Sequence, residues 1–302
     1  MVRIEGYAMS TIDDLSDVQR DALRMVEGRL DALYSPDLRR PVPELVRLWE
    51  SLGYWTSYDL ETGGVASNCL HVAQAVFRLR GDHAAALGHL RYWQERCWPL
   101  LLRMFELAKP DCVASIHRGP DDPAPRDPLP LPIDPYHSLA CPLCVLLLSG
   151  DRKHAMALAE LARDESVFLI RQPPKDGVAW RIMVLHWFRL LRGERDRVLW
   201  SDFDGLSEKH MANEFRLYYP LAPLIAKGDV EGFKAQLAVC EADFRKRGRS
   251  KKNDVLDLWG YGKIGQVSSI DLWGTALCRL AAWSGMPIDI DTELYPKAFH
   301  RD

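Results

Sequence analysis

The sequence lacks an apolar run long enough to cross a membrane, and its first residues contain no basic-then-apolar signal. A membrane-spanning helix needs about 20 apolar residues, and the longest apolar tract, PLCVLLLSG at 142–150, is too short. Charge imbalance is also small, with 39 Lys and Arg against 42 Asp and Glu, which argues against general nucleic-acid binding and against disorder. The seven cysteines are scattered through apolar segments, as is typical of buried thiols in a reducing compartment. We therefore expect a cytoplasmic protein that does not span a membrane.

Familiar catalytic motifs are missing as well: the chain has no G-x-S-x-G, no H-E-x-x-H and no Walker loop. One short segment, WGYGKIGQ, places Gly260, Gly262 and Gly265 at the G-x-G-x-x-G spacing of a dinucleotide-binding turn. That turn belongs to a parallel sheet, and Asp257 interrupts the buried strand that would have to precede it. We interpret the segment as a connector between helices, and we predict no enzyme, no catalytic residue and no cofactor. An enzyme that uses this glycine loop is the third hypothesis, after two binding functions described below.

A metal site is the next possibility, because HSLACPLC offers His137, Cys141 and Cys144. A structural zinc ion needs four ligands, usually from two such pairs. Only Cys112 or His117, on the far side of a proline-rich loop, is available to complete the set. The two cysteines stand three apart at the start of an apolar segment, which favours packing in a core. We predict no metal site.

Four joints along the chain share one pattern, in which a glycine followed by an acidic residue separates two helical apolar segments. Glycine adopts the left-handed conformation that closes a helix, and the acid after it can cap the next helix or face its positive end. Each joint therefore predicts the tip of an antiparallel helical hairpin. The joints are Arg80-Gly81-Asp82, Ser149-Gly150-Asp151, Arg192-Gly193-Glu194 and Lys227-Gly228-Asp229.

Apolar residues recur at spacings of three and four between these joints, which predicts amphipathic helices. The longest predicted helix covers 82–109 and contains Pro99, which we expect to kink or split it. The last helix is expected to begin at Ser268 or Ser269 and to be closed by Gly285. A shorter acidic helix is expected after the third joint. The other predicted helices cover 41–55, 65–79, 138–148, 152–163, 176–191, 211–226 and 229–247, and one more begins at Ser10 or Thr11.

The unequal distances between the joints predict an irregular all-α bundle of antiparallel helical hairpins, TPR-like in places, rather than a regular solenoid. Residues 118–135 interrupt the helices with seven prolines, which exclude a helix interior and a central strand. We expect residues 1–302 to form a single helical domain. A division into 1–117 and 136–302 around the proline-rich loop is the alternative.

Charge is unevenly distributed along the chain. Residues 245–252 contain six basic side chains in eight positions, so the rest of the chain is acidic. We interpret the run as a solvated helix end, where cations suit the helix dipole, and a phosphate or acidic-partner contact is the alternative. No aromatic residues are interleaved with it, so direct nucleic-acid binding is not expected.

Acidic residues on predicted loops and helix starts have two interpretations. Each one alone is explained by solubility or by capping of a helix. As a group they form a patch suited to a basic partner, because complementary charge speeds association and sets specificity. The candidate partner-binding residues are Asp121 and Asp122 in the proline-rich loop, and Asp202, Asp204 and Glu208 in WSDFDGLSEKH.

The last quarter of the chain contains a set of features in a characteristic order. A G-D-x-E-x-F joint opens a long amphipathic helix, and a variable connector leads to a helix rich in Leu and Ala. A glycine, a short hydrophobic-acidic stretch and a Tyr-Pro pair complete the segment. The residues concerned are Gly228, Asp229, Glu231, Phe233, Leu272, Ala276, Leu277, Leu280, Ala281, Gly285, Tyr295 and Pro296.

In this order and spacing, residues 225–299 resemble the immunity protein 49 family of bacterial polymorphic-toxin systems. The charged connector RGRSKKND and the extra glycines after it depart from the family pattern. A second helical immunity family, paired with PoNe-type nucleases, also ends in a Tyr-Pro segment and is a competing resemblance. The residues that carry the resemblance look structural, so no functional residue is carried over from the family.

The resemblance implies an all-helical, cytoplasmic, non-enzymatic protein that binds a cognate toxin and blocks its active site or substrate groove. If the toxin is directed at nucleic acid, its site should be basic, and the acidic candidates above would face it. A TPR-like adaptor or regulator, which holds a peptide or protein partner in a concave helical surface, is the alternative function.

Overall fold

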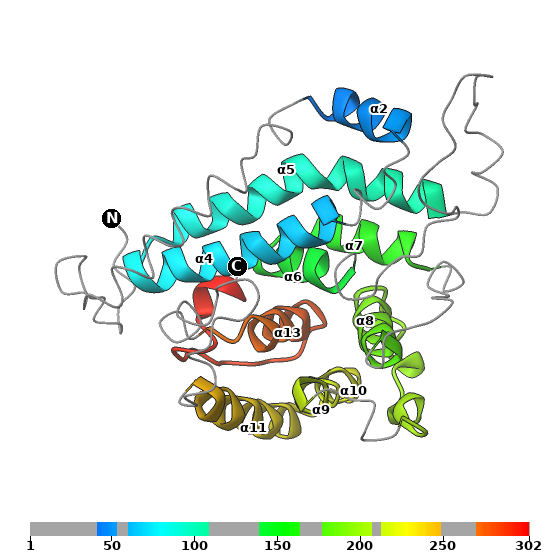
Figure 1. Ribbon diagram of the computed structural model, residues 1–302. Coiled ribbons are helices and arrows are strands. Elements are labelled where there is room, and N and C mark those ends of the chain that lie inside the picture. Colours follow the sequence, from blue (N-terminus) through cyan, green and yellow to red (C-terminus); the bar gives the residue numbers. More distant parts are fainter. Residues whose placement is uncertain are drawn as a thin grey trace.

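Helices account for 78% of the described residues, and none of those residues lies in a strand. The all-α prediction is therefore confirmed (Figure 1). The expected N-terminal helix, the proline-rich loop and the glycine triplet lie outside the described residues. The structure is a computed structural model of the chain, and it describes residues 41–52, 60–108, 139–163, 177–206, 213–248 and 270–301.

The helix α4 (Val65–Arg80) and the long helix α5 (His83–Ala108) pack against each other as an antiparallel pair (Figure 1). α5 continues through Pro99 as one helix, so the expected split does not occur. A short π-helical turn, η2 (Leu60–Gly64), precedes α4. It is tied to α5 because the buried indole of Trp93 donates a hydrogen bond of 2.7 Å to its backbone.

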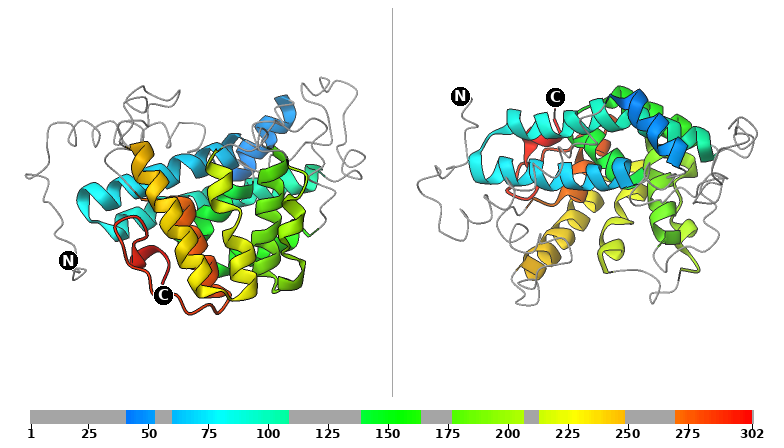
Figure 2. Two further views of the ribbon diagram at one scale, coloured as in Figure 1. Left: turned by 90° about the horizontal axis from the view of Figure 1, so that it is seen from below. Right: turned by 45° about the horizontal axis from the view of Figure 1, so that its top comes forward.

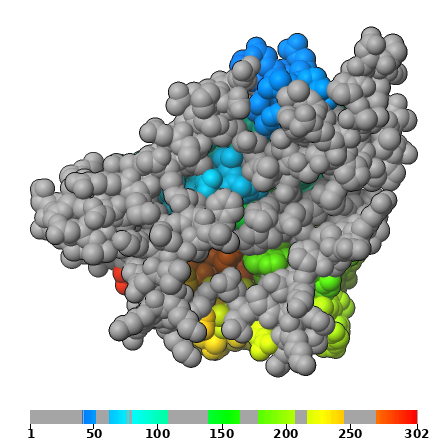
Figure 3. All heavy atoms as spheres, viewed as in Figure 1, coloured from blue at the N-terminus to red at the C-terminus, as the bar shows by residue number. Residues whose placement is uncertain are grey.

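The outer side of α5 carries α2 (Val42–Leu52), whose residues are visible at the top of the molecule in Figure 3. Leu45 and Trp49 of α2 are buried against the core. Glu50 adds an ion pair with Arg103 of α5, with 2.6 Å between their atoms. α2 is therefore held by one apolar stripe and a charged contact beside it.

The centre of the core is α6 (Cys141–Leu148), in which every residue is buried. A helix that is apolar on all sides must be covered on all sides. α4, α5, α7 (Arg152–Leu161) and α13 (Leu272–Trp283) all pack against it. The sequence motif CPLCVLLL is thus the helix around which the rest of the core packs.

On the far side of α13, three helices lie side by side: α8 (Gly177–Leu191), α10 (Leu221–Lys227) and α11 (Val230–Gly248) (Figure 2). α10 lies between the other two and contacts both. Trp187 of α8 and Phe233 of α11 are completely buried by this arrangement.

The left-handed glycine is confirmed at all four predicted joints, and a helix follows three of them. Gly81, Gly150, Gly193 and Gly228 have φ values of 64°, 74°, 77° and 69°, in the left-handed region where only glycine is unstrained. Three of the following acids cap the next helix by accepting a backbone N–H: Asp82 from Ala85 at 2.9 Å, Asp151 from His154 at 3.0 Å and Asp229 from Gly232 at 2.9 Å.

Two predicted helices are wrong. The segment 211–226 forms two helices, α9 (Asn213–Tyr218) and α10, with a turn between them. Pro220 explains the break, because a proline disfavours helical backbone in the residue before it. After Gly193 the chain forms two short 3₁₀ turns, η6 (Arg195–Arg197) and η7 (Trp200–Phe203), instead of an acidic helix.

The start of the last helix also differs from the prediction. α13 begins at Leu272, and its N-cap is Asp271, not Ser268 or Ser269. The Asp271 carboxylate accepts the backbone N–H of Gly274 at 3.0 Å. The predicted end is confirmed, since Gly285 closes the helix with φ 76°.

Asp271 is almost fully buried, and its carboxylate accepts hydrogen bonds from separate parts of the chain. Besides Gly274, its donors are the hydroxyl of Tyr218 in α9 at 2.8 Å and that of Tyr295 at 3.2 Å. The Tyr295 hydroxyl also lies 3.1 Å from the carbonyl of Leu237 in α11. Burial raises the pKa of both tyrosines, so they remain protonated donors. The carboxylate therefore connects α9, α13 and the C-terminal segment, and Tyr295 extends the connection to α11.

We expect Tyr218→Phe to destabilise the fold by about 1–3 kcal/mol, because it leaves the buried carboxylate with one donor fewer. The control is Tyr219→Phe, at the neighbouring position, which keeps its ring contacts with Trp200 and Phe203 and should change stability by less than about 0.5 kcal/mol. Urea unfolding measures both. Equal losses in the two variants would contradict the role assigned to the Asp271 contact.

The C-terminal segment is secured by a second cluster, around Phe299. The Phe299 ring packs edge-on against His83 of α5, with 5.0 Å between ring centroids, and its carbonyl accepts from buried Arg279 at 3.3 Å. The next residue, His300, is completely buried and donates to the carbonyl of Tyr295 at 3.3 Å. Burial lowers the pKa of both histidines, and the positive charge of Arg279 lowers each pKa further.

This cluster predicts a loss of stability in mild acid. With folded-state pKa values below the unfolded value of about 6.5, the unfolded chain binds protons first as pH falls through that value. The two histidines therefore make their full contribution to the free energy of unfolding above about pH 7. That contribution declines as pH falls from there towards the folded-state pKa values. The measurement is urea unfolding at about pH 7.5 and 5.5 for the original chain and for His300→Gln. The variant should lose less stability between the two pH values, and an unchanged difference would refute this role of His300.

Candidate interaction site

The structure describes two of the five acidic residues predicted to bind a partner. Asp202 lies within η7 and Asp204 directly follows it. Asp121, Asp122 and Glu208 lie outside the described residues. The region around η6 and η7 is therefore where the predicted site can be examined.

Asp202 is already engaged by two side chains of α8. Its Oδ2 atom lies 2.8 Å from Nε2 of His186 and 3.1 Å from a guanidinium nitrogen of Arg189. His186 is completely buried and packs edge-on against Phe203, with 5.2 Å between ring centroids. The Asp202 carboxylate thus fastens η7 to α8, whereas Asp204 is exposed.

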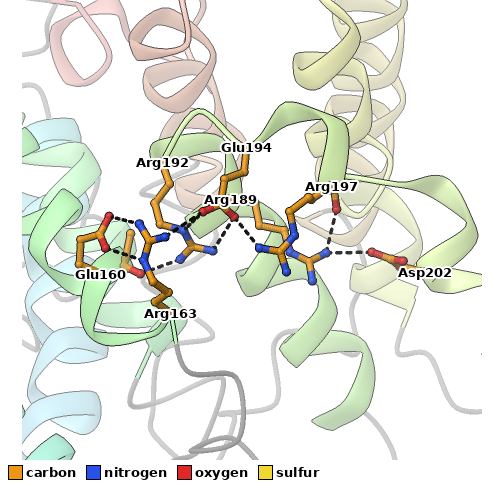
Figure 4. A network of polar contacts seen from close by, with 8 residues as sticks. Glu160, Arg163, Arg189, Arg192, Glu194, Arg197 and Asp202 are labelled. Atoms are coloured by element: carbon orange, nitrogen blue, oxygen red, sulfur yellow. Dashed lines mark hydrogen bonds and ion pairs between the residues drawn. The ribbon is translucent and has the colours of Figure 1, made fainter.

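Asp202 belongs to a network of charged side chains that runs from the end of α7 to η7 (Figure 4). Its centre is a two-bond fork between Arg192 and Glu194, with distances of 2.8 and 3.1 Å. Glu194 also lies 3.0 Å from Arg197 and 3.7 Å from Arg163. The members labelled in Figure 4 are Glu160, Arg163, Arg189, Arg192, Glu194, Arg197 and Asp202.

Arg192 is the buried member of this network. Its side chain is 2% exposed, and it donates a further hydrogen bond of 2.6 Å to the carbonyl of Ala159 in α7. The pKa of Glu194 is lowered, first by its hydrogen bond with Arg192. A charged pair with its hydrogen-bonding groups satisfied is held in one geometry. The joint at Gly193 is therefore fixed to both α7 and α8.

Backbone and aromatic contacts fix the two turns further. Arg189 donates to the carbonyl of Arg197 at 2.8 Å, which connects α8 to η6. In η7, the rings of Trp200 and Phe203 pack on Tyr219, with centroid distances of 6.0 and 4.6 Å. The turns are thereby docked on the α9–α10 joint as well as on α8.

One apolar side chain is exposed on this framework. Val198 and Leu199 both have extended backbone, in which successive side chains point to opposite faces. Val198 is buried, so Leu199 projects outward and is 47% exposed. The residues of α8 and these turns form part of the surface at the lower right of Figure 3.

The six described cysteines are all buried. Cys144 donates to the carbonyl of Leu272 at 3.7 Å, and burial raises its pKa well above the ordinary value. The prediction that Cys141 and Cys144 pack in the core is confirmed by their burial. Within the described ranges, no group of three or more His, Cys, Asp or Glu residues is placed to hold a metal ion. No helix in those ranges has the length and apolar character required to span a membrane.

Sequence reasoning found Asp202 and Asp204 but missed the network that contains Asp202. The available signal was RLLRGERDR, residues 189–197, in which Arg and acidic residues alternate around the joint glycine. Arg189 and Arg192 stand three apart and so share a helix face. Their actual partners lie across the joint and on α7, and only the fold brings these together.

Comparison of the chain with models of known protein families, with curated proteins and with solved structures found no match in any of the three.

We expect Arg192→Lys to lower the free energy of unfolding by about 1–3 kcal/mol, because lysine keeps the charge but cannot form the two-bond fork or reach Ala159 in the same geometry. Arg163→Lys is the matched control. It breaks a similar fork with Glu160, at 2.8 Å for both bonds, on a side chain that is 59% exposed. That change should cost much less than Arg192→Lys, because solvent screens an exposed ion pair. Urea unfolding measures both variants. If Arg163→Lys lowers the free energy of unfolding as much as Arg192→Lys does, burial does not set the strength of the fork.

Proposed function

We propose that this chain is an immunity protein, which neutralises a cognate bacterial toxin by binding it stoichiometrically in the cytoplasm. The observation that carries the proposal is the resemblance of residues 225–299 to the immunity protein 49 family. The structural roles of the residues that carry the resemblance add support.

The first part of the pattern is the joint that opens α11. Gly228 supplies the left-handed turn, Asp229 caps the helix and Phe233 is completely buried. The exposed Glu231 sits in the first turn of the helix and pairs with Lys234 at 3.2 Å. Each position of G-D-x-E-x-F therefore has a separate structural task at this joint.

The second part of the pattern consists of α13 and the segment that follows it. Leu277 and Leu280 of α13 are completely buried, and Gly285 closes that helix. Tyr295, from the Tyr-Pro pair, reaches both α11 and Asp271 through its hydroxyl. The pattern thus describes two helices that are linked through the segment after α13, and its residues have structural roles.

The proposed mechanism is occlusion of the active site or substrate groove of the toxin. Binding that depends on shape needs a surface that loses little entropy on association. The turns η6 and η7 meet this need, because the fork of Arg192 and Glu194 and the aromatic contacts of Trp200 and Tyr219 hold them in place.

The test uses the toxin domain encoded beside this gene, produced together with the chain in a sensitive host. We expect the chain to restore growth and to form a one-to-one complex with the purified toxin domain. A toxin domain from an unrelated locus serves as the control and should remain lethal. If the neighbouring toxin keeps full activity in the presence of excess purified chain, the proposal is wrong.

A further inference from the structure

We propose that the C-terminal strap, residues 296–301, is a pH-sensitive segment that leaves the surface of the bundle in mild acid while the helical core stays folded. The groups that release it are the imidazoles of His83 and His300, which share a cluster with the guanidinium of Arg279. Stability lost in acid can come from opening of the whole fold or of one segment, and the contacts of the strap favour the second. This inference concerns the chain by itself and does not depend on the proposed function.

Contacts with three helices hold the strap against the bundle. It contains the short 3₁₀ turn η10 (Lys297–Phe299), which is drawn in red close to α4 and α13 in Figure 1. The ring of Phe299 packs on Phe77 of α4 and on His83 of α5, with 4.8 and 5.0 Å between ring centroids. The carbonyl of Phe299 accepts a hydrogen bond of 3.3 Å from Arg279 of α13. One aromatic side chain and one carbonyl therefore carry most of the docking.

The strap is able to leave without the rest of the fold. Tyr295, the residue before it, is fastened by its hydroxyl to Asp271 and to the carbonyl of Leu237, and these bonds do not involve the strap. Three backbone N–H groups of the strap donate to carbonyls within it. Its ion pairs with the exposed Asp289 contribute little to docking, because solvent screens them. A segment with so few contacts opens at a lower free energy than the core does.

The buried nitrogens of the two imidazoles suit only the neutral form of each ring. Nε2 of His83 and Nδ1 of His300 are buried and have no hydrogen-bond partner among the described residues. A protonated imidazole carries an N–H at both nitrogens, so protonation places a buried donor without an acceptor in each ring. An unmade hydrogen bond is most costly for a buried charged group. Release of the strap removes this cost, because water then reaches both rings.

The charges around the two rings favour the same outcome. Burial is the main cause that lowers the pKa of both histidines, and the positive charge of Arg279 lowers each pKa further. Backbone hydrogen bonds with Ala298 and Tyr295 oppose this effect only in part. α4 meets His83 with the uncharged ring of Phe77. The other charged groups that act on the two rings are Arg91 and Asp82 of α5, and Arg301 and Asp291, with the two carboxylates weakest in effect.

The direction of the pH dependence follows from these lowered pKa values. Once the strap has left, both rings are in water, where a histidine has a pKa of about 6.5. The released state therefore binds protons first as pH falls, so docking is fully favoured above about pH 7 and weakens from there towards the docked-state pKa values. In that range each histidine raises the equilibrium constant for release by up to about tenfold per pH unit, and the two together by up to about 100-fold.

Hydrogen exchange followed by mass spectrometry tests the inference on the full chain, with the rates corrected for the intrinsic pH dependence of exchange. From about pH 7.5 to 5.5, we expect the protection of the strap amides to fall by more than about tenfold. The amides of α6, which is buried on every side, should keep their protection over the same range.

Two variants identify the groups that release the strap. His300→Gln and His83→Gln each remove one titrating ring and keep a polar side chain, so each should reduce the fall in protection by several-fold, up to about tenfold. The two histidines act separately, and each variant therefore tests the inference without the other. The matched control is His154→Gln on α7, where the imidazole lies 2.8 Å from the carboxylate of Asp151 and does not contact the strap. The control should show the same fall as the original chain.

Each remaining outcome counts against the inference. If α6 loses protection in step with the strap, acid opens the whole fold and the strap is not a separate unit. If the strap keeps its protection at the lower pH, protonation does not release it. If both glutamine variants show the pH dependence of the original chain, other groups control the strap, and the role assigned to His83 and His300 is wrong.

Discussion

The hydrogen bonds to the buried carboxylate of Asp271 are the interaction on which the second half of the fold depends. Burying a carboxylate is costly unless donors surround it, and here a backbone N–H and two tyrosine hydroxyls do so. Because the donors come from different segments, the carboxylate is satisfied only when those segments have their native positions. Gly274 is part of the same constraint, since a Cβ there would lie 2.4 Å from the ring of Tyr295. The site therefore selects one arrangement among the many that apolar helices allow.

Apolar packing and the polar contacts have different tasks in this molecule. α6 supplies a hub that is buried on every side, and any bundle of similar helices gains from covering it. Such packing is not directional, so it leaves the angles and the depth of neighbouring elements open. The Arg192–Glu194 fork and the Asp202 contacts are directional, and they position two turns that have little helical structure of their own. The proposed binding surface is built on those turns.

Glycine-acid joints and apolar periodicity predicted most of the helices, because both depend on neighbouring residues in the chain. The predictions of helix bounds fail where a contact distant in sequence or a single proline sets the end of a helix. Pro220 divides 211–226, and the α13 cap moves to Asp271 because that carboxylate also has tertiary donors. At the site, the sequence drew attention to Asp202 and Asp204 as similar acids. Their difference comes from His186 and Arg189, which approach only one of them in the fold.

The sequence by itself determined an all-α chain, the positions of the glycines that close its helices at the four joints, and the burial of its described cysteines. These features follow from glycine conformation, capping and the hydrophobic period, all of which act over a few residues. Tertiary structure alone decided which charges are neutralised and which side chains are presented to solvent. Glu194 forms an ion pair with Arg163, which lies 31 positions earlier in the chain. Leu199 faces outward because Val198, the residue before it, is buried in the core. A charge or an apolar side chain has its role set by its surroundings, and those surroundings come from residues distant in sequence.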